Sequence, residues 1–227
     1  MNLQAKQKSN FPVIKALFGG TFDPIHYGHL LPIEKLAQQV YLQKVILIPN
    51  HIPPHKSQPT TTAQQRLDML KLAIKHKPLF SIDTREFNRI TPSYTIETIL
   101  SIRQQIGWKK SLAFIIGQDS LLSINTWFNW QKILKICHLL VYPRPGYTNK
   151  CFENIYMRQW IKQYQVYFPA ILRYKPFGAI YLANTPLLNI SSTEIRKYQY
   201  DKKNSKKILP PLVLRYVKKN QLYKNEY

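Results

Sequence analysis

Cysteine is scarce in this chain of 227 residues, which contains only Cys137 and Cys151. The two residues do not have the spacing of a metal site, and such low cysteine usage is typical of a reducing compartment. The first residues, MNLQAKQKSNFPVIK, include lysines but no apolar core of a signal peptide. The sequence therefore predicts a cytoplasmic protein without a protein-bound metal.

Long apolar runs are also missing. No run approaches the roughly 20 residues that a membrane-spanning helix needs, so we expect no membrane partner. Hydrophobic residues still make up 44% of the chain, a normal share for a globular protein with a buried core. The length suits one domain, or one domain with a small lid.

Acidic residues are few: 11 Asp and Glu face 33 Lys and Arg, which gives a net charge of +22. A nucleic-acid surface usually clusters its charge and interleaves stacking aromatics, whereas the lysines here are scattered. The scattered charge favours a solvated surface over a dedicated polyanion site. In either case the positive field would attract phosphorylated substrates. RNA binding remains the alternative from another functional class, because HYGH also resembles the motif of class I tRNA synthetases. The chain has no second domain of the size that binds an anticodon in those enzymes.

Six short apolar runs show little alternation, as strands buried on both faces do. They cover residues 13–18, 44–49, 79–83, 112–117, 138–143 and 179–184. Helical patterns cover residues 29–40, 63–76, 94–106, 119–136, 153–164, 193–198 and 210–221. Because strand and helix alternate, we expect an α/β fold with a doubly wound, mostly parallel sheet and helices on both faces. Ligands of such sheets bind beyond the carboxyl ends of the strands.

Glycine occurs only seven times, yet two glycines stand together in LFGGTFDPIHYGHL, directly after the first apolar run. Gly19 and Gly20 would let backbone N–H groups approach a phosphate, as would the start of the following helix. His26 and His29 are three residues apart and fall on one side of a first helical turn. Imidazoles donate hydrogen bonds to phosphoryl oxygens and, if protonated, stabilise negative charge. The alternative is a Gly-rich turn with two structural histidines.

A second polar motif, NISSTEIR, follows the last apolar run. Ser191 and Glu194 have the spacing of a capping box, so a helix should begin here. Arg196 would lie in the first turns, where the helix dipole disfavours a cation, and an anionic partner would explain its presence. The alternative is an ordinary cap with a surface arginine.

Together, GGTFDPIHYGH and ISSTEIR resemble the two signature motifs of the nucleotidylyltransferase superfamily. The segments between them, PNHIPPHK, PSYT, IGQDS, TWF and RPGY, resemble in order and spacing those of bacterial nicotinate-nucleotide adenylyltransferases. The resemblance runs from residue 16 to residue 223. It implies a Rossmann-like domain over 16–227, with 1–15 as a flexible N-terminal extension.

The resemblance also implies a reaction, the transfer of the adenylyl group of ATP to nicotinate mononucleotide to form deamido-NAD and pyrophosphate. Mg²⁺ would accompany ATP, and no specific nucleic acid would be involved. The same transfer to nicotinamide mononucleotide or another phosphorylated acceptor stays open. So does the choice between a monomer and a homo-oligomer.

The resemblance assigns roles residue by residue. His26, His29 and Arg196 would be catalytic. The ATP-binding residues would be Gly20, His29, Gly117, Asp119, Ser192, Thr193 and Arg196. The mononucleotide-binding residues would be Gly19, Gly20, Thr21, Lys56, Tyr94, Thr95, Trp127 and Phe128.

Several of these residues also have purely structural interpretations. Trp127 would stack on the flat pyridine ring, but it could equally be a core tryptophan of an amphipathic helix. Lys56 could be a surface lysine. Position 128 is phenylalanine here, whereas the family often has tyrosine at the matching position. The backbone N–H of Phe128 could still donate to a nicotinate carboxylate.

Overall fold

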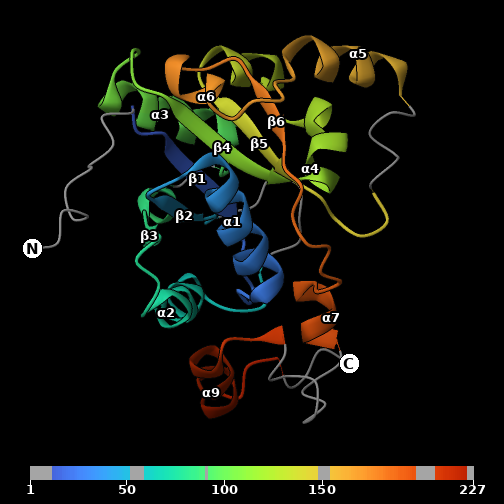
Figure 1. Ribbon diagram of the computed structural model, residues 1–227. Helices are drawn as coiled ribbons and strands as arrows, with labels where there is room; N and C mark the ends of the chain where they lie inside the picture. Colours follow the sequence, from blue (N-terminus) through green and yellow to red (C-terminus); the bar gives the residue numbers. More distant parts are fainter. Residues whose placement is uncertain (1–11, 52–58, 90–91, 148–153, 198–207, 224–227) are drawn as a thin grey trace, which may run out of the picture.

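A computed structural model describes residues 12–51, 59–89, 92–147, 154–197 and 208–223. Its sheet has six strands: β1 (Lys15–Gly20), β2 (Val45–Pro49), β3 (Phe80–Ile82), β4 (Leu112–Gly117), β5 (His138–Tyr142) and β6 (Ile180–Leu182). All pairings are parallel, in the order β3-β2-β1-β4-β5-β6 (Figure 1). The predicted doubly wound α/β fold is confirmed, and each of the six predicted strands is present.

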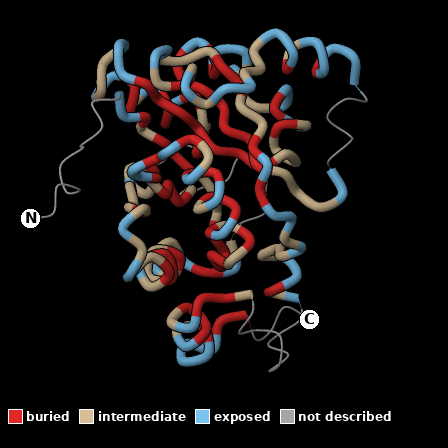
Figure 2. The backbone as a smooth tube through the Cα atoms, viewed as in Figure 1, coloured by how far each residue is buried: buried red, intermediate tan, exposed pale blue. Residues whose placement is uncertain are grey.

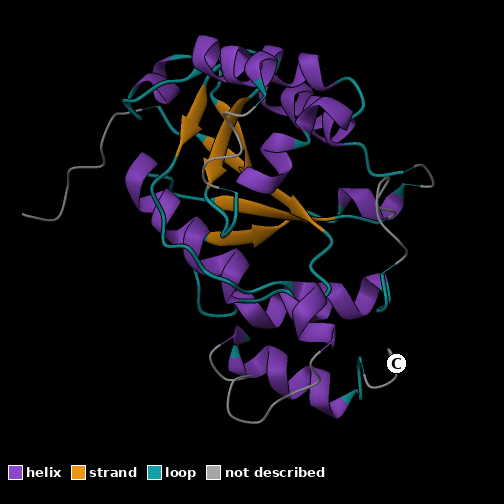
Figure 3. Ribbon diagram, turned by 90° about the vertical axis from the view of Figure 1, so that its right-hand side faces the viewer, coloured by secondary structure: helices purple, strands orange, loops and turns teal. Residues whose placement is uncertain are grey.

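Helices cover both faces of the sheet (Figure 3). One core contains residues of α1 (Tyr27–Val40), α2 (Ala63–Ile74), α6 (Ile171–Tyr174) and α9 (Pro211–Lys219). The opposite core contains residues of α3 (Thr95–Ile106), α4 (Gln118–Leu122) and α5 (Ile155–Tyr164). Figure 2 shows the resulting band of buried backbone along the strands.

The central strands are apolar throughout because both of their faces are covered. Successive residues of β1 alternate between the two cores: Ala16 and Phe18 belong to the first, and Leu17 belongs to the second. All six residues of β4 are buried. This two-sided burial explains why the apolar runs of the sequence show so little alternation.

The predicted helix over residues 119–136 is wrong. Three short pieces replace it: α4, η2 (Ile124–Thr126) and η3 (Trp130–Lys135). Asn129 adopts a left-handed backbone with φ 54°, and Trp127 before it is extended, so no continuous helix can form. Leu121, Ile124 and Ile133 are all buried, and their spacing imitated one helical face.

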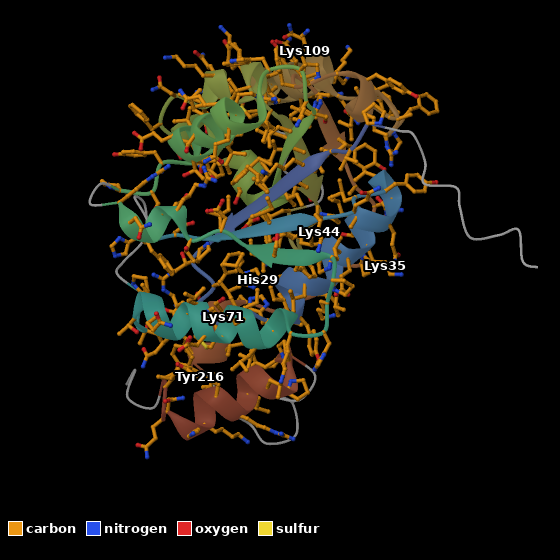
Figure 4. All side chains as sticks on the ribbon, turned by 90° about the vertical axis from the view of Figure 1, so that its left-hand side faces the viewer. His29, Lys35, Lys44, Lys71, Lys109 and Tyr216 are labelled. Atoms are coloured by element: carbon orange, nitrogen blue, oxygen red, sulfur yellow. The ribbon has the colours of Figure 1, made fainter. Side chains whose placement is uncertain are left out.

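The two termini of the described chain enter the fold differently. Residues 1–11 lie outside the described residues, whereas Ile14 is buried and Lys15 opens β1. At the other terminus, α9 packs against α2 (Figure 4). In the described part of the chain, no helix combines the length and the apolar character that a membrane crossing requires.

Candidate active site

A cavity of about 750 Å³ opens where the chain order of the sheet reverses, between β1 and β4. Residues at the carboxyl ends of both strands line it, among them Gly20 and Gly117. Crossovers leave β1 and β4 toward opposite edges of the sheet, which opens a crevice at this switch point. The volume is within the range of small-molecule sites, roughly 300–1,000 Å³.

The loop between β1 and α1 forms one wall of the cavity. Gly19, Gly20 and Thr21 line the cavity directly, and His29 reaches it from the first turn of α1 (Figure 4). His26 caps the helix from the preceding position and is only 1% exposed. Its ring stacks on that of His29 with centroids 3.7 Å apart, so His29 faces the cavity and His26 supports it from behind.

The environment of His26 keeps its imidazole neutral. Burial lowers the pKa of His26 to about 3, and the positive charge of Arg144 acts in the same direction. A group with that pKa carries no proton charge near neutrality. The protonated form that the sequence left open is therefore disfavoured at His26, which acts as a neutral hydrogen-bonding ring.

The second motif forms α7 (Ser192–Lys197), which begins where the capping box predicts. The N–H of Glu194 donates to Ser191 Oγ over 3.1 Å, and Ser191 Oγ donates to Glu194 Oε2 over 3.0 Å. Within the described residues α7 has six residues, and Arg196 lies in its last turn, not in the first turns as the sequence predicted. The helix dipole does not disfavour a cation there, so an anionic partner is not needed to explain Arg196.

Contacts of Arg196 and Ser192 join the two motifs. Arg196 Nη1 donates to the carbonyl of Asp23 over 2.7 Å, and Ser192 Oγ donates to the carbonyl of Pro24 over 3.0 Å. Ser192, Thr193 and Arg196 all line the cavity. Two segments separated by about 170 residues therefore form one continuous wall.

Gly28 allows this close approach. A Cβ atom built there would lie 2.9 Å from the carbonyl oxygen of Ile190 and 2.9 Å from His26 Nδ1. Neither neighbour is the free end of a flexible side chain, so any larger residue would separate the two motifs or displace the His26 ring. The glycine of HYGH is therefore explained by packing between the motifs.

A charged group, Asp119 and Arg144, lines the cavity next to the ends of β4 and β5. Asp119 Oδ1 and Arg144 Nε are 3.6 Å apart, and both side chains are partly exposed. The guanidinium of Arg144 also lies over the ring of Tyr142, 5.6 Å from its centroid. A Cβ at Gly117 would collide with Asp119 Oδ1, so the glycine lets this carboxylate fold back toward the strand.

An aromatic group, Tyr94, Trp127 and Phe128, also lines the cavity. The rings of Tyr94 and Phe128 are 4.9 Å apart. The preceding residue, Ser93, accepts a hydrogen bond from the N–H of His51 over 3.1 Å, which ties the start of α3 to the end of β2. Trp127 lies in extended backbone between two short helices and not on a helix face.

Arg66 joins the loop after β1 to the end of β2. Its side chain is buried, and Nη1 donates to the carbonyls of Thr21 over 3.0 Å and of Asn50 over 2.5 Å. Burial lowers the pKa of Arg66, and the nearby Asp23 opposes this shift. Because its ordinary pKa is so high, Arg66 stays charged and adds positive potential below the loop.

Most predicted site residues lie around this one cavity. The lining includes Gly19, Gly20, Thr21, His29, Tyr94, Thr95, Gly117, Asp119, Trp127, Phe128, Ser192, Thr193 and Arg196. His26 lies behind His29, and Lys56 falls outside the described residues.

Sequence reasoning missed several residues of the lining, notably Asp23, Asn50, Glu86 and Arg144. Asn50 and Arg144 follow the ends of buried strands, and that position was a usable signal for both. Asp23 was visible within the Phe-Asp-Pro turn but was given no role. Glu86 lies on η1 (Arg85–Asn88), and nothing in the sequence marked it.

A family model described as cytidylyltransferase-like matches residues 17–198. A protein from Yersinia enterocolitica named "Probable nicotinate-nucleotide adenylyltransferase" is 53% identical over 217 residues, which cover 96% of this chain and 98% of that one. This chain belongs to the nicotinate-nucleotide adenylyltransferase family. The resemblance carried by the sequence motifs is thereby confirmed.

Further members of the nicotinate-nucleotide adenylyltransferase family agree. A Serratia proteamaculans protein of the same name is 53% identical over 93% of this chain and 96% of its own. Among solved structures, the Plasmodium falciparum nicotinic acid mononucleotide adenylyltransferase complexed with NaAD has a TM-score of 0.70 at 22% identity. The match covers 93% of this chain and 97% of that one, and it confirms the fold.

Proposed function

We propose that this protein transfers the adenylyl group of ATP to nicotinate mononucleotide. A phosphate oxygen of the mononucleotide attacks the α-phosphorus of ATP and forms a new P–O bond. The bond from the α-phosphorus to the bridging oxygen of the β-phosphate breaks, and pyrophosphate leaves. The products are deamido-NAD and pyrophosphate. The high identity to proteins of this name over nearly the whole chain supports the proposal.

One structural observation carries the proposal: the joined motifs, the charged group and the aromatic group all line a single cavity. Two phosphorylated substrates, one bound at the charged group and one at the aromatic group, would bring their phosphates to the wall that the joined motifs form. That wall offers backbone N–H groups, His29 and Arg196. Phosphates repel each other, so alignment and charge compensation are the main tasks of such an enzyme.

The chemistry of the wall suits an attacking group that is already anionic. A phosphate nucleophile needs no strong base. His29 at the cavity can donate a hydrogen bond to a phosphate, and neutral His26 stacks behind it. Arg196 would compensate negative charge that grows at the α-phosphorus, held in place by the Asp23 carbonyl. Ser192 and Thr193 would add donors to the ATP phosphates.

The two groups beside the wall would sort the substrates. Asp119 would accept hydrogen bonds from the ribose hydroxyls of ATP, close to the backbone of Gly117. Trp127 would stack on the pyridine ring, with Phe128 offering its backbone N–H to the nicotinate carboxylate. Gly19, Gly20 and Thr21 would hold the mononucleotide phosphate, and Tyr94 and Thr95 would border its ribose. Lys56 keeps its predicted role as a phosphate contact.

Mg²⁺ would arrive as part of the ATP complex. The described residues contain no group of three or more His, Cys, Asp and Glu that could hold a metal ion. A magnesium ion that enters with ATP needs no such group, because phosphate oxygens and water supply most of its ligands. We place the reaction in the cytoplasm, where the free, buried thiol of Cys137 would stay reduced.

The test is a pyrophosphate-release assay on the purified protein with ATP and Mg²⁺. We expect rapid release with nicotinate mononucleotide and much slower release with nicotinamide mononucleotide. Faster release with the amide would assign the same chemistry to the other acceptor. No release with either mononucleotide would contradict the proposal. A reaction without protein controls for chemical hydrolysis of ATP.

A further inference from the structure

The carboxylate of Asp23 is buried beside the cavity and is held by residues far away in sequence. Its Oδ1 accepts hydrogen bonds from Thr61 Oγ1 over 2.6 Å and from the Tyr223 hydroxyl over 2.7 Å. Its Oδ2 accepts one from the N–H of Thr60 over 2.9 Å. Only 2% of Asp23 is exposed. A carboxylate so deeply buried depends on such donors, so they fix where it lies.

The position of Asp23 matters because its backbone belongs to the wall of the cavity. Its carbonyl accepts the 2.7 Å hydrogen bond from Arg196, which lines the cavity. The backbone carbonyl of Thr21, two residues earlier, is held by Arg66. A displacement of the Asp23 carboxylate would therefore move both the loop that faces the phosphates and the carbonyl that holds the arginine.

Tyr223 is the most distant of these anchors, 200 residues from Asp23 in sequence. It is 4% exposed, and its backbone has the left-handed φ of 64°. The residue follows α9, which packs on α2 (Figures 1 and 4), and its hydroxyl reaches Asp23 from this C-terminal segment. Tyr223 is not among the residues that line the cavity.

We infer that Tyr223 is a positioning residue for adenylyl transfer and acts through Asp23 on Arg196. This inference rests on the proposed function. The hydroxyl donates to the same oxygen, Oδ1, as Thr61 Oγ1, but it comes from a segment far from residues 60–61 in sequence. Without it, Asp23 keeps the two donors of that segment and can shift toward them. Such a shift would take its carbonyl away from Arg196, which then loses its alignment with the reacting phosphate.

The chain supplies a matched control. Tyr216 lies on α9, and its hydroxyl donates to Asp68 Oδ2 of α2 over 3.1 Å. Tyr223 and Tyr216 both belong to the C-terminal segment. Tyr223→Phe and Tyr216→Phe each remove one phenol hydroxyl that donates to an aspartate elsewhere in the chain. Only the Tyr223 hydroxyl binds an aspartate whose carbonyl holds a residue of the cavity.

Both variants are assayed for pyrophosphate release, with rates divided by the folded fraction from urea unfolding. We expect Tyr223→Phe to lower kcat on the order of tenfold, because small misplacements of catalytic groups are costly, while KM for each substrate changes less than about twofold. Tyr216→Phe should keep the wild-type kcat. An unchanged kcat in Tyr223→Phe, or an equal loss in both variants, would overturn the inference.

A double variant separates positioning from a general loss of structure. In an Arg196→Gln background, Tyr223→Phe should have little further effect, because the residue through which it acts is gone. The same tenfold loss in both backgrounds would contradict action through Arg196. If Tyr223→Phe is partly unfolded, the assay is repeated with trimethylamine N-oxide, which favours the folded state. Recovery of the wild-type kcat would then overturn the inference.

Wild-type activity distinguishes this inference from the function on which it rests. A wild-type protein that releases no pyrophosphate with either mononucleotide contradicts the proposed function itself. A fully active wild type together with a fully active Tyr223→Phe contradicts only the role of Tyr223.

Discussion

The charged group and the aromatic group of the cavity are held in place by different means. Asp119 and Arg144 each lie two residues after the end of a strand, β4 and β5 respectively. Their opposite charges compensate each other, with Asp119 Oδ1 3.6 Å from Arg144 Nε. The aromatic group comes from the start of α3 and from irregular backbone between short helices. The sheet therefore fixes the charged group, whereas contacts between loops fix the aromatic group.

Because the two groups are held differently, we expect each of them to bind a different substrate. A carboxylate held near a strand end is suited to a constant feature such as the ribose of ATP. Aromatic rings are suited to binding a flat base, because the faces of the rings stack on it. His29 lies on the shared wall, with His26 behind it, and should serve both substrates equally.

The largest expected effect tests that shared wall. His29→Ala should lower kcat by 10²–10³, about 3–4 kcal/mol of lost transition-state stabilisation, because a donor to the reacting phosphates is removed. Neither KM should change by a comparable factor. Steady-state kinetics measure this, with exposed His76→Ala as the control. A loss confined to one substrate's KM would place His29 with one of the two groups instead.

The charged group should affect ATP alone. Asp119→Ala is expected to raise KM for ATP on the order of tenfold, because a buried ribose hydroxyl would lose its acceptor at roughly 1.5–3 kcal/mol. KM for nicotinate mononucleotide should stay within about twofold. The ion pair with Arg144 is partly exposed, so the free energy of unfolding should change by less than about 1 kcal/mol. A selective effect on the mononucleotide would reverse the assignment of the two sides.

The aromatic group should show the complementary behaviour. Trp127→Ala should raise KM for the mononucleotide about tenfold, since stacking on an aromatic ring is worth roughly 1–3 kcal/mol per base. Tyr156→Ala removes an aromatic side chain that is 80% exposed and serves as the control. Kinetics with each substrate varied in turn provide the measurement. An altered KM for ATP alone would contradict stacking on the pyridine.

The last prediction concerns the stability of the protein and its dependence on pH, not the rate of the reaction. The pKa of His26 is about 3 in the folded protein and near 6.5 in the unfolded chain, so the unfolded state binds more protons between these values. His26 therefore lowers stability as pH falls from about 6.5 toward 3, by at most about 1.4 kcal/mol per pH unit, and has no effect above that range.

Urea unfolding at pH 7.0, 6.0 and 5.0 measures this dependence. His26→Gln should be less sensitive to pH than the wild type, because the variant lacks this proton uptake in the unfolded state. His138, whose pKa burial lowers to about 4, acts in the same direction and remains in both proteins. Equal pH dependence in the two proteins would show that the His26 ring is not neutral and buried as described.

The sequence predicted the architecture well because the central strands β1 and β4 are mostly apolar on both faces and each is followed at its carboxyl end by a polar motif. The prediction of one helix over residues 119–136 was wrong. Leu121, Ile124 and Ile133 have a helix-like spacing, but the left-handed backbone of Asn129 interrupts the helix between them. Local periodicity cannot reveal a backbone that turns to present an aromatic side chain to a cavity.

For the site, residues next to a recognisable motif could be predicted, but contacts between distant segments could not. Arg196 was identified with the right motif, but its hydrogen bond to the Asp23 carbonyl depends on the folded chain. The separation of His26 and His29 into a supporting and a cavity-facing ring was also invisible. Both histidines have the same chemistry in sequence, and only burial distinguishes them.

The contact between Asp23 and Tyr223 has a consequence for the order in which the protein is made. Asp23 is synthesised 200 residues before the tyrosine that holds it. A growing chain can contain the whole sheet and both motifs and still lack this anchor. Catalytic competence would then arise only after Tyr223 itself has been synthesised and has reached Asp23.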